Sequence, residues 1–162
     1  MSNKIRMALL ATGLAMASGI ASAAEQTLEC KLYIAESLDH ASTYAVESTG
    51  SLLNGVRRAG ICVFADGSVA DKQFVMGMNI RDEGSAGDAV GISVYTFESG
   101  DSLTLSFTGG WDKGPFAGEY TVLSGTGAFQ GATGTGTISG VDGPWNSTTI
   151  VDIRIDVMTA GS

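Results

Sequence analysis

Five side chains of this sequence could transfer protons and lie on or beside segments in which apolar and polar residues alternate. The five candidate catalytic residues are Tyr95, Glu98, Glu119, Tyr120 and Arg154. Burial among apolar walls disfavours the charged form, so the pKa of a buried carboxyl group rises toward the range useful for a general acid or base. The sequence therefore predicts acid–base chemistry wherever these groups point into the fold.

Strand geometry limits which of these side chains can act together. Glu119 and Tyr120 are adjacent, and consecutive strand residues point to opposite faces, so only one of the two can face an interior. Arg154 lies between Asp152 and Asp156 on one face of its segment. Such a row is typical of an exposed charge ladder, which we favour over an interior position for Arg154.

Four aromatic residues are candidates for binding a ligand: Trp111, Phe116, Phe129 and Trp145. Segments 111–116 and 142–145 share an aspartate, a Gly-Pro pair and an aromatic residue, which predicts two turns that each carry an aromatic lid. These rings could surround the opening of a cavity or could cap the core.

Metal and cofactor chemistry finds no support in the sequence. Asp82, Glu83 and Asp88 lack the ligand spacing of a calcium loop, and His40 is the only histidine. The glycine-rich stretch has no lysine of the kind that completes a phosphate-binding loop. We therefore expect no metal and no cofactor.

The elements that must position these residues are short strands. Three segments alternate clearly, and six further runs are separated by turn residues, which predicts eight or nine strands and no long helix. This pattern indicates an all-β antiparallel meander, closed as a barrel or folded as a sandwich. The clear segments are 28–34, 102–108 and 151–157, and the further runs are about 42–50, 56–65, 72–81, 90–98, 116–124 and 133–140.

The first 23 residues predict an export signal. Lys4 and Arg6 precede an apolar run over residues 7–20, and Ala21-Ser22-Ala23 is a typical processing site. The run is too short to span a bilayer, so a retained membrane anchor is disfavoured. We expect residues 24–162 to form one domain that is periplasmic or secreted.

Cys30 and Cys62 are the only cysteines. In an exported protein such a pair is typically bridged, and the bridge would tie the first strand to the third. A reactive thiol pair would favour closer spacing or basic neighbours. We therefore predict a structural disulfide.

Charge and composition exclude one class of partner. Residues 24–162 contain 17 acidic and seven basic residues, a net charge of −10. A surface of this sign repels phosphate backbones, so nucleic acid is not an expected partner. The 23 glycines and two prolines of the full chain fit a turn-rich β domain.

A glycine-rich segment predicts a strand end, a compact turn with positive φ, an inward-pointing Phe129 and a return strand near Thr133. The segment is Gly125-Thr-Gly-Ala-Phe-Gln-Gly-Ala-Thr-Gly134. It resembles the strand-turn-strand of the allene oxide cyclase and dirigent superfamily of small β-barrels. That resemblance implies an eight-stranded antiparallel barrel, lipocalin-like in shape, with an apolar cavity, no cofactor and frequent trimers. Together with the export signal it predicts an exported bacterial member.

Members of that superfamily direct the cyclisation or coupling of reactive small molecules. The resemblance therefore implies a barrel that encloses a small apolar molecule, either to direct a cofactor-free cyclisation or isomerisation or only to carry it. A periplasmic or cell-surface structural module with a packed barrel core is the alternative. A barrel embedded in the outer membrane is disfavoured, because the first and last strands carry charges on their second face.

Overall fold

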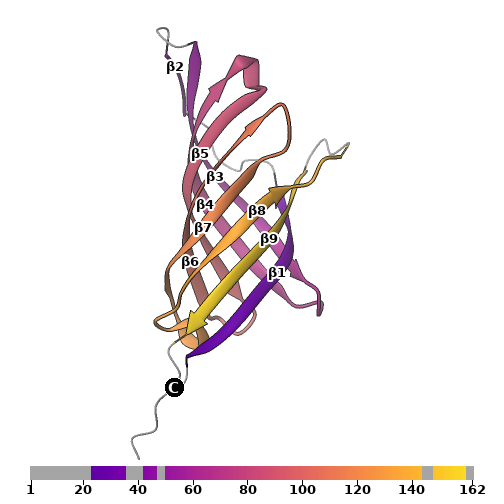
Figure 1. Ribbon diagram of the computed structural model, residues 1–162, viewed down its shortest axis with the longest axis vertical. Helices are drawn as coiled ribbons and strands as arrows, with labels where there is room; N and C mark the ends of the chain where they lie inside the picture. Colours follow the sequence, from indigo (N-terminus) through magenta and orange to yellow (C-terminus); the bar gives the residue numbers. More distant parts are fainter. Residues whose placement is uncertain (1–22, 36–41, 47–49, 144–147, 160–162) are drawn as a thin grey trace, which may run out of the picture.

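The computed structural model describes residues 23–35, 42–46, 50–143 and 148–159, and the predicted export signal lies outside this part of the chain. The described residues form nine strands and two short 3-10 turns, η1 and η2 (Figure 1). Their bounds are β1 Ala24–Ala35, β2 Ser42–Val46, β3 Ser51–Phe64, β4 Val69–Arg81, η1 Asp82–Gly84, β5 Ala86–Phe97, β6 Ser102–Asp112, β7 Ala117–Gly125, η2 Gly127–Phe129, β8 Thr133–Gly140 and β9 Thr148–Thr159.

Eight of these strands close into a barrel. The sheet runs in the order β1-β9-β8-β7-β6-β5-β4-β3-β2, with every pair antiparallel, and an additional pairing of β1 with β3 closes the ring. Strand β2 pairs only with the outer part of β3 and extends the sheet beyond one end of the barrel (Figure 1). The prediction of an all-β, eight-stranded antiparallel barrel is confirmed.

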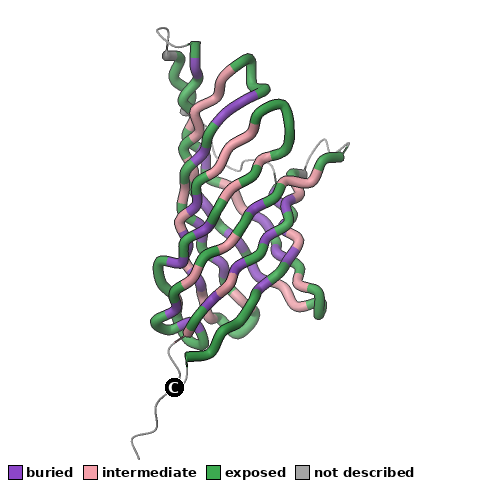
Figure 2. The backbone as a smooth tube through the Cα atoms, viewed as in Figure 1, coloured by how far each residue is buried: buried purple, intermediate pink, exposed green. Residues whose placement is uncertain are grey.

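Alternation along the strands builds the interior. On β1 the buried residues are Leu28, Cys30, Leu32 and Ile34, and on β9 every second residue from Val151 to Val157 is buried (Figure 2). Because successive strand side chains point to opposite faces, the intervening polar residues face outward. The hydrophobic effect thus fixes the register, since a one-residue slip would turn this apolar set toward water.

The observed strands differ from the predicted ones mainly at their ends. The run expected over 42–50 is a strand only from Ser42 to Val46 in the described residues, and β3 already begins at Ser51. Strands β4 and β5 begin at Val69 and Ala86, three or four residues earlier than expected. Long twisted hairpins continue pairing past the last apolar residue, so hydrophobic alternation alone underestimates their length.

The predicted disulfide is confirmed and lies across the closing seam of the barrel. Cys30 of β1 and Cys62 of β3 are bonded, with their Cα atoms 5.6 Å apart. Only five residues of each strand pair at this seam, from Cys30 to Ile34 on β1, whereas β1 and β9 pair over twelve residues. The bond therefore reinforces one of the two shortest pairings in the closed ring, the other being the five-residue pairing of β7 with β8.

One end of the barrel is closed by aromatic rings. Phe129, at the end of η2, is buried and packs on Phe97 with ring centroids 4.7 Å apart, and Phe97 stacks on Phe64 at 5.9 Å. Gly127 begins η2 with φ of 55°. The expected positive-φ turn and the inward plug at Phe129 are both confirmed.

We expect Gly127→Val to lower the free energy of unfolding by at least about 1 kcal/mol, because a β-branched residue is strained at positive φ. Its Cβ would also overlap the carboxylate of Asp101. Gly55→Val is the matched control, since Gly55 lies in a strand at negative φ with open space around its Cα. Urea unfolding checks both variants, and equal stability of Gly127→Val and the parent would refute the strain argument.

Candidate functional site

The barrel contains a cavity of about 340 Å³ at the end opposite the Phe129 plug. Aliphatic, methionine and aromatic side chains make most of its wall, and Lys72, Arg58 and Tyr120 supply its strongly polar groups. The lining residues are Ile34, Arg58, Lys72, Phe74, Met76, Met78, Ala89, Phe107, Trp111, Phe116, Tyr120, Ile138, Thr149 and Val151. No carboxylate appears among them.

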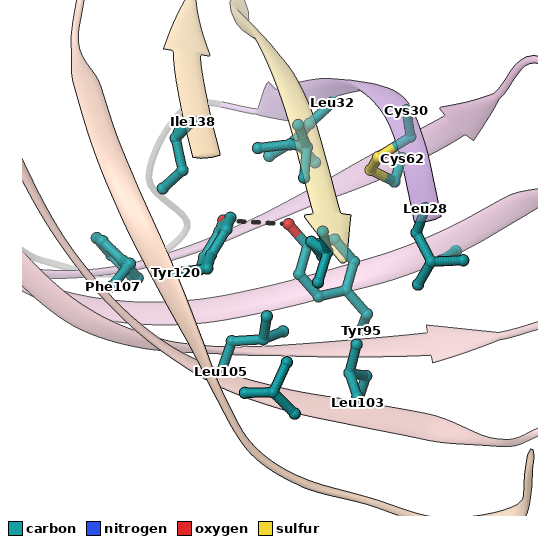
Figure 3. Close-up of a cluster of buried hydrophobic side chains, with 14 of the residues drawn as sticks. Leu28, Cys30, Leu32, Cys62, Tyr95, Leu103, Leu105, Phe107, Tyr120 and Ile138 are labelled. Carbon is teal, nitrogen blue, oxygen red and sulfur yellow. Dashed lines mark hydrogen bonds between the residues drawn. A yellow bond between two sulfur atoms is a disulfide. The ribbon is translucent and has the colours of Figure 1, made fainter. Parts of the chain in front are cut away.

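A buried hydrogen-bonded group lies at the inner end of this cavity. The Lys72 ammonium donates to the Tyr120 hydroxyl over 2.6 Å, and the hydroxyls of Tyr120 and Tyr95 are 3.1 Å apart (Figure 3 draws the tyrosine pair). We call Lys72, Tyr95 and Tyr120 the Lys72 cluster. Lys72 of β4 lies directly opposite Tyr95 of β5 in the strand register, and Tyr120 comes from β7. The closed barrel brings these three strands together.

Lys72 is almost completely buried, with 3% of its surface exposed. Burial lowers the pKa of its amine from 10.5 to about 7, because an ammonium loses its hydration inside the barrel. Four aromatic rings oppose this effect by favouring the charged form. The nitrogen lies 4.7 Å from the Phe74 centroid, 5.2 Å from those of Tyr95 and Tyr120, and 6.0 Å from that of Phe107. Both protonation states are therefore accessible near neutral pH.

The two tyrosines are neutral hydrogen-bonding groups at physiological pH. Burial raises the pKa of Tyr120 to about 12, and burial likewise raises the pKa of Tyr95 well above its ordinary value. Each phenol can donate one hydrogen bond and accept others. The Lys72 cluster therefore combines an amine that titrates near neutrality with a phenol that keeps its proton.

Two of the aromatic candidates contribute to the outer wall of the cavity. Trp111 and Phe116 line it, and the indole nitrogen of Trp111 donates to the carbonyl of Gly84 over 2.9 Å. Residue 87 must be glycine for this arrangement, because a Cβ there would overlap the Trp111 ring. The absence of a side chain on β5 thus makes room for the indole.

Three predicted catalytic residues lie outside the barrel. Glu98 is exposed in the turn after β5, and Glu119 points away from the interior that its neighbour Tyr120 enters. Arg154 is exposed and paired with Glu29 at 2.5 Å and with Asp156 at 3.0 Å, so the charge-ladder interpretation is confirmed. The hydrogen bonds that Arg154 donates to the Asp156 carboxylate raise the pKa of Arg154. An interior position is therefore corrected for Glu98 and Glu119, while Tyr95 and Tyr120 are inside.

Two of the aromatic candidates do not contribute to the cavity wall. Phe129 is buried at the closed end, among the core residues, and does not border the cavity. Its backbone turn directs it to the base of the barrel, where it packs in the core, away from the cavity. Trp145 lies outside the described residues.

Sequence analysis missed Lys72 and Arg58. A signal for Lys72 was present, because Ala70, Lys72, Phe74 and Met76 share one face of an alternating strand whose other face holds Asp71 and Gln73. A lysine on the apolar face of a strand indicates a buried amine. Arg58 has no such signal, since the adjacent Arg57 offers an equal alternative for the inward position.

The fold and cavity together define a small antiparallel β-barrel, plugged at one end, with one buried polar cluster beneath an apolar chamber. A structure of a pterocarpan synthase dirigent protein is similar to this chain, with a TM-score of 0.57 and 16% sequence identity over 93% of this chain and 98% of the other. The likeness shows that the fold is dirigent-like. No protein-family model matches the sequence, and no curated protein matches it either.

Within the described residues, no helix is long and apolar enough to cross a membrane. The same part of the chain contains no group of three or more histidine, cysteine, aspartate or glutamate side chains placed to hold a metal ion. The strongly polar groups that line the cavity, among the described residues, are those of Lys72, Tyr120 and Arg58.

Proposed function

We propose that this protein encloses a small apolar molecule in its barrel and directs a cofactor-free isomerisation or cyclisation of that molecule. The observation that carries the proposal is the cavity of about 340 Å³, apolar over most of its wall and bordered at its inner end by the buried pair Lys72 and Tyr120. Such a chamber, with few polar groups at fixed positions, is the usual design of a small-molecule site.

The Lys72 cluster supplies the proton transfer that this reaction class needs. In its ammonium form Lys72 gives a proton to one atom of the bound molecule, and the Tyr120 hydroxyl donates a hydrogen bond to an oxygen on which charge develops. The amine left on Lys72 then takes a proton from another carbon, which completes an isomerisation with no net change in atoms or electrons. Tyr95 positions the Tyr120 hydroxyl across 3.1 Å.

Ligand enclosure is tested by native mass spectrometry of the protein purified from its own host. We expect a bound apolar species in the parent and its loss in Ala89→Phe, because Ala89 is buried in the cavity wall and a phenyl ring would fill the chamber. Ala59→Phe is the control, since Ala59 lies on the outward-facing set of β3. Clean apo protein, with no thermal shift across a library of lipids and phenols, would instead favour the packed structural module.

The ligand found in this way decides between catalyst and carrier. We expect Lys72→Met to abolish conversion of the bound molecule or its precursor, because methionine fills the same volume without a basic nitrogen. Tyr95→Phe should reduce the rate more mildly, since it leaves Tyr120 and Lys72 in contact. Binding without conversion by the parent protein would make the barrel a carrier.

We further propose that the protein is exported and that residues 24–162 are its mature domain. The disulfide between Cys30 and Cys62 supports this proposal, because such bonds persist in oxidising compartments. Intact mass measurement of protein from the periplasm or medium should show a chain that begins at Ala24. A chain that still carries residues 1–23 in the cytoplasm would contradict export.

Self-association is proposed for the outer face of β4 and β5, in line with the trimers that the resemblance implies. Val75, Val90 and Ile92 are each about half exposed there, and Val75 lies opposite Ile92 in the register. Apolar side chains grouped in this way favour burial against a second copy of the chain. Ile92→Lys should convert the oligomer to a monomer in light scattering, and a monomeric parent would refute the proposal.

A further inference from the structure

Among the residues that the structure describes, two cationic side chains and no carboxylate line the cavity. Arg58 lines it from β3 and Lys72 lines it from β4. None of the carboxylate side chains in the described part of the chain borders it, although the net charge of the whole sequence is −8. Positive charge is therefore gathered inside the barrel against the overall charge of the protein, and burying unpaired charge is costly.

The two cations are close enough to share one ligand group. In the pairing of β3 with β4, Arg58 lies opposite Phe74, and Gly60 lies opposite Lys72. Arg58 and Lys72 are therefore diagonal neighbours on the inner face of these two strands. Diagonal neighbours in a sheet are about 7–8 Å apart at the backbone, within reach of two long side chains. Gly60, between Arg58 and Cys62 on the same face, adds no side chain to the gap.

Arg58 also has unused hydrogen-bonding capacity. Its Nε is buried and has no hydrogen-bond partner among the described residues. A guanidinium carries its charge at every physiological pH and offers paired donors that fit a carboxylate. Within the described part of the chain, the Lys72 ammonium donates only to the Tyr120 hydroxyl. That hydroxyl is neutral and cannot balance the charge of the ammonium.

We propose that Arg58 and Lys72 form an anion subsite, and that the enclosed molecule is an apolar monocarboxylate whose carboxylate enters first and whose apolar body extends past Phe107 toward Trp111 and Phe116. This inference rests on the proposed function and specifies its ligand class. One carboxylate accepts hydrogen bonds from both cations and removes the cost of leaving them unpaired. The aromatic wall then contacts the rest of the molecule.

The subsite predicts a preference for acids over neutral molecules of the same shape. The probes are decanoate against 1-decanol and 2-naphthoate against 2-naphthalenemethanol, titrated by calorimetry into the mature protein after removal of any retained ligand. We expect each acid to bind at least tenfold more tightly than its alcohol. Equal affinity within both pairs would overturn the anion subsite while leaving ligand enclosure intact, whereas no binding of any probe would count against enclosure itself.

Substitutions of the cationic residues test which of them binds the carboxylate. Arg58→Met should remove most of the preference for acid over alcohol while keeping the binding of the alcohol. Arg57→Met is the matched control, because Arg57 is adjacent in sequence but faces outward and donates to Gln73. Loss of preference in both variants, or in neither, would overturn the assignment to Arg58. Lys72→Met should likewise lower affinity for the acid more than for the alcohol.

Proton uptake on ligand binding distinguishes a direct role of Lys72 in binding from a purely structural role. Among the described residues, the titratable groups that face Lys72 are Tyr95 on β5, Tyr120 on β7 and Arg58 on β3, and none of them is a carboxylate. A bound carboxylate favours the ammonium form of Lys72, so binding at pH 8 should take up protons in the parent. Calorimetry in buffers of different ionisation enthalpy measures this uptake. Its absence in the parent, or its persistence in Lys72→Met, would overturn the role of Lys72.

Discussion

Lys72→Met is expected to make the protein more stable at pH 7, although it removes the central residue of the proposed site. Because burial lowers the pKa of the amine from 10.5 to about 7, folding at neutral pH must either discharge Lys72 or bury an ammonium. A pKa difference of this size corresponds to about 4 kcal/mol at pH 7 at most. The surrounding rings and the Tyr120 hydroxyl offset part of it, so we expect a gain of about 1–3 kcal/mol.

The lowered pKa of Lys72 makes the free energy of unfolding depend on pH in a way that identifies this residue. Between pH 7 and pH 10.5 the unfolded chain binds more protons at this lysine than the folded chain, so the free energy of unfolding rises with pH in that window. Above about pH 10 it should fall, because burial raises the pKa of Tyr95 and Tyr120 and the unfolded tyrosines ionise first. Maximal stability is therefore expected near pH 9–10.

Urea unfolding at pH 7 and pH 9.5 checks the prediction. The parent should gain up to about 3 kcal/mol between these pH values, and Lys72→Met should gain little. Lys31→Met is the control, because Lys31 is an exposed lysine paired with Asp152 on the outside of the barrel. A parent whose stability is flat over this range, or a Lys31→Met variant that loses the pH response, would contradict the burial argument.

The second large effect is expected from the disulfide. Replacing both Cys30 and Cys62 with alanine should lower the free energy of unfolding by about 3–4 kcal/mol, because the bond closes a loop that spans 32 positions in sequence. The loss falls on the seam between β1 and β3, where only five residue pairs hold the ring closed. Ile34 and Arg58 line the cavity from the two strands of this seam, so ligand binding should weaken as well.

Chemical denaturation with and without reductant measures this contribution. Reductant should destabilise the parent by the same amount as the double substitution and should leave the Cys30→Ala/Cys62→Ala variant unchanged. Denatured parent without reductant should show no free thiol. Two titratable thiols, or a double variant as stable as the parent, would contradict a structural role for the bond.

Local sequence determined the architecture of this protein. Alternation in segments such as 28–34 and 151–157 requires two-faced strands, and the turn residues between such segments are too closely spaced to leave room for helical crossovers. The Gly127 turn, the disulfide and the outward charge ladder at Arg154 could also be predicted. Each of these depends on a few neighbouring residues or on the pairing of the only two cysteines.

Only the tertiary structure decided which polar groups share the interior. Glu98 and Glu119 have the residue types of catalytic groups, yet a turn and the strand parity place them in water. Lys72 meets Tyr120 because ring closure brings β4 and β7, separated by 48 residues in sequence, to facing walls of one barrel. The alternation within one strand determines the face to which a side chain points. Which side chains then meet across the cavity depends on the number of strands, on their stagger and on the strand pair that closes the ring. No single segment of the sequence encodes these properties.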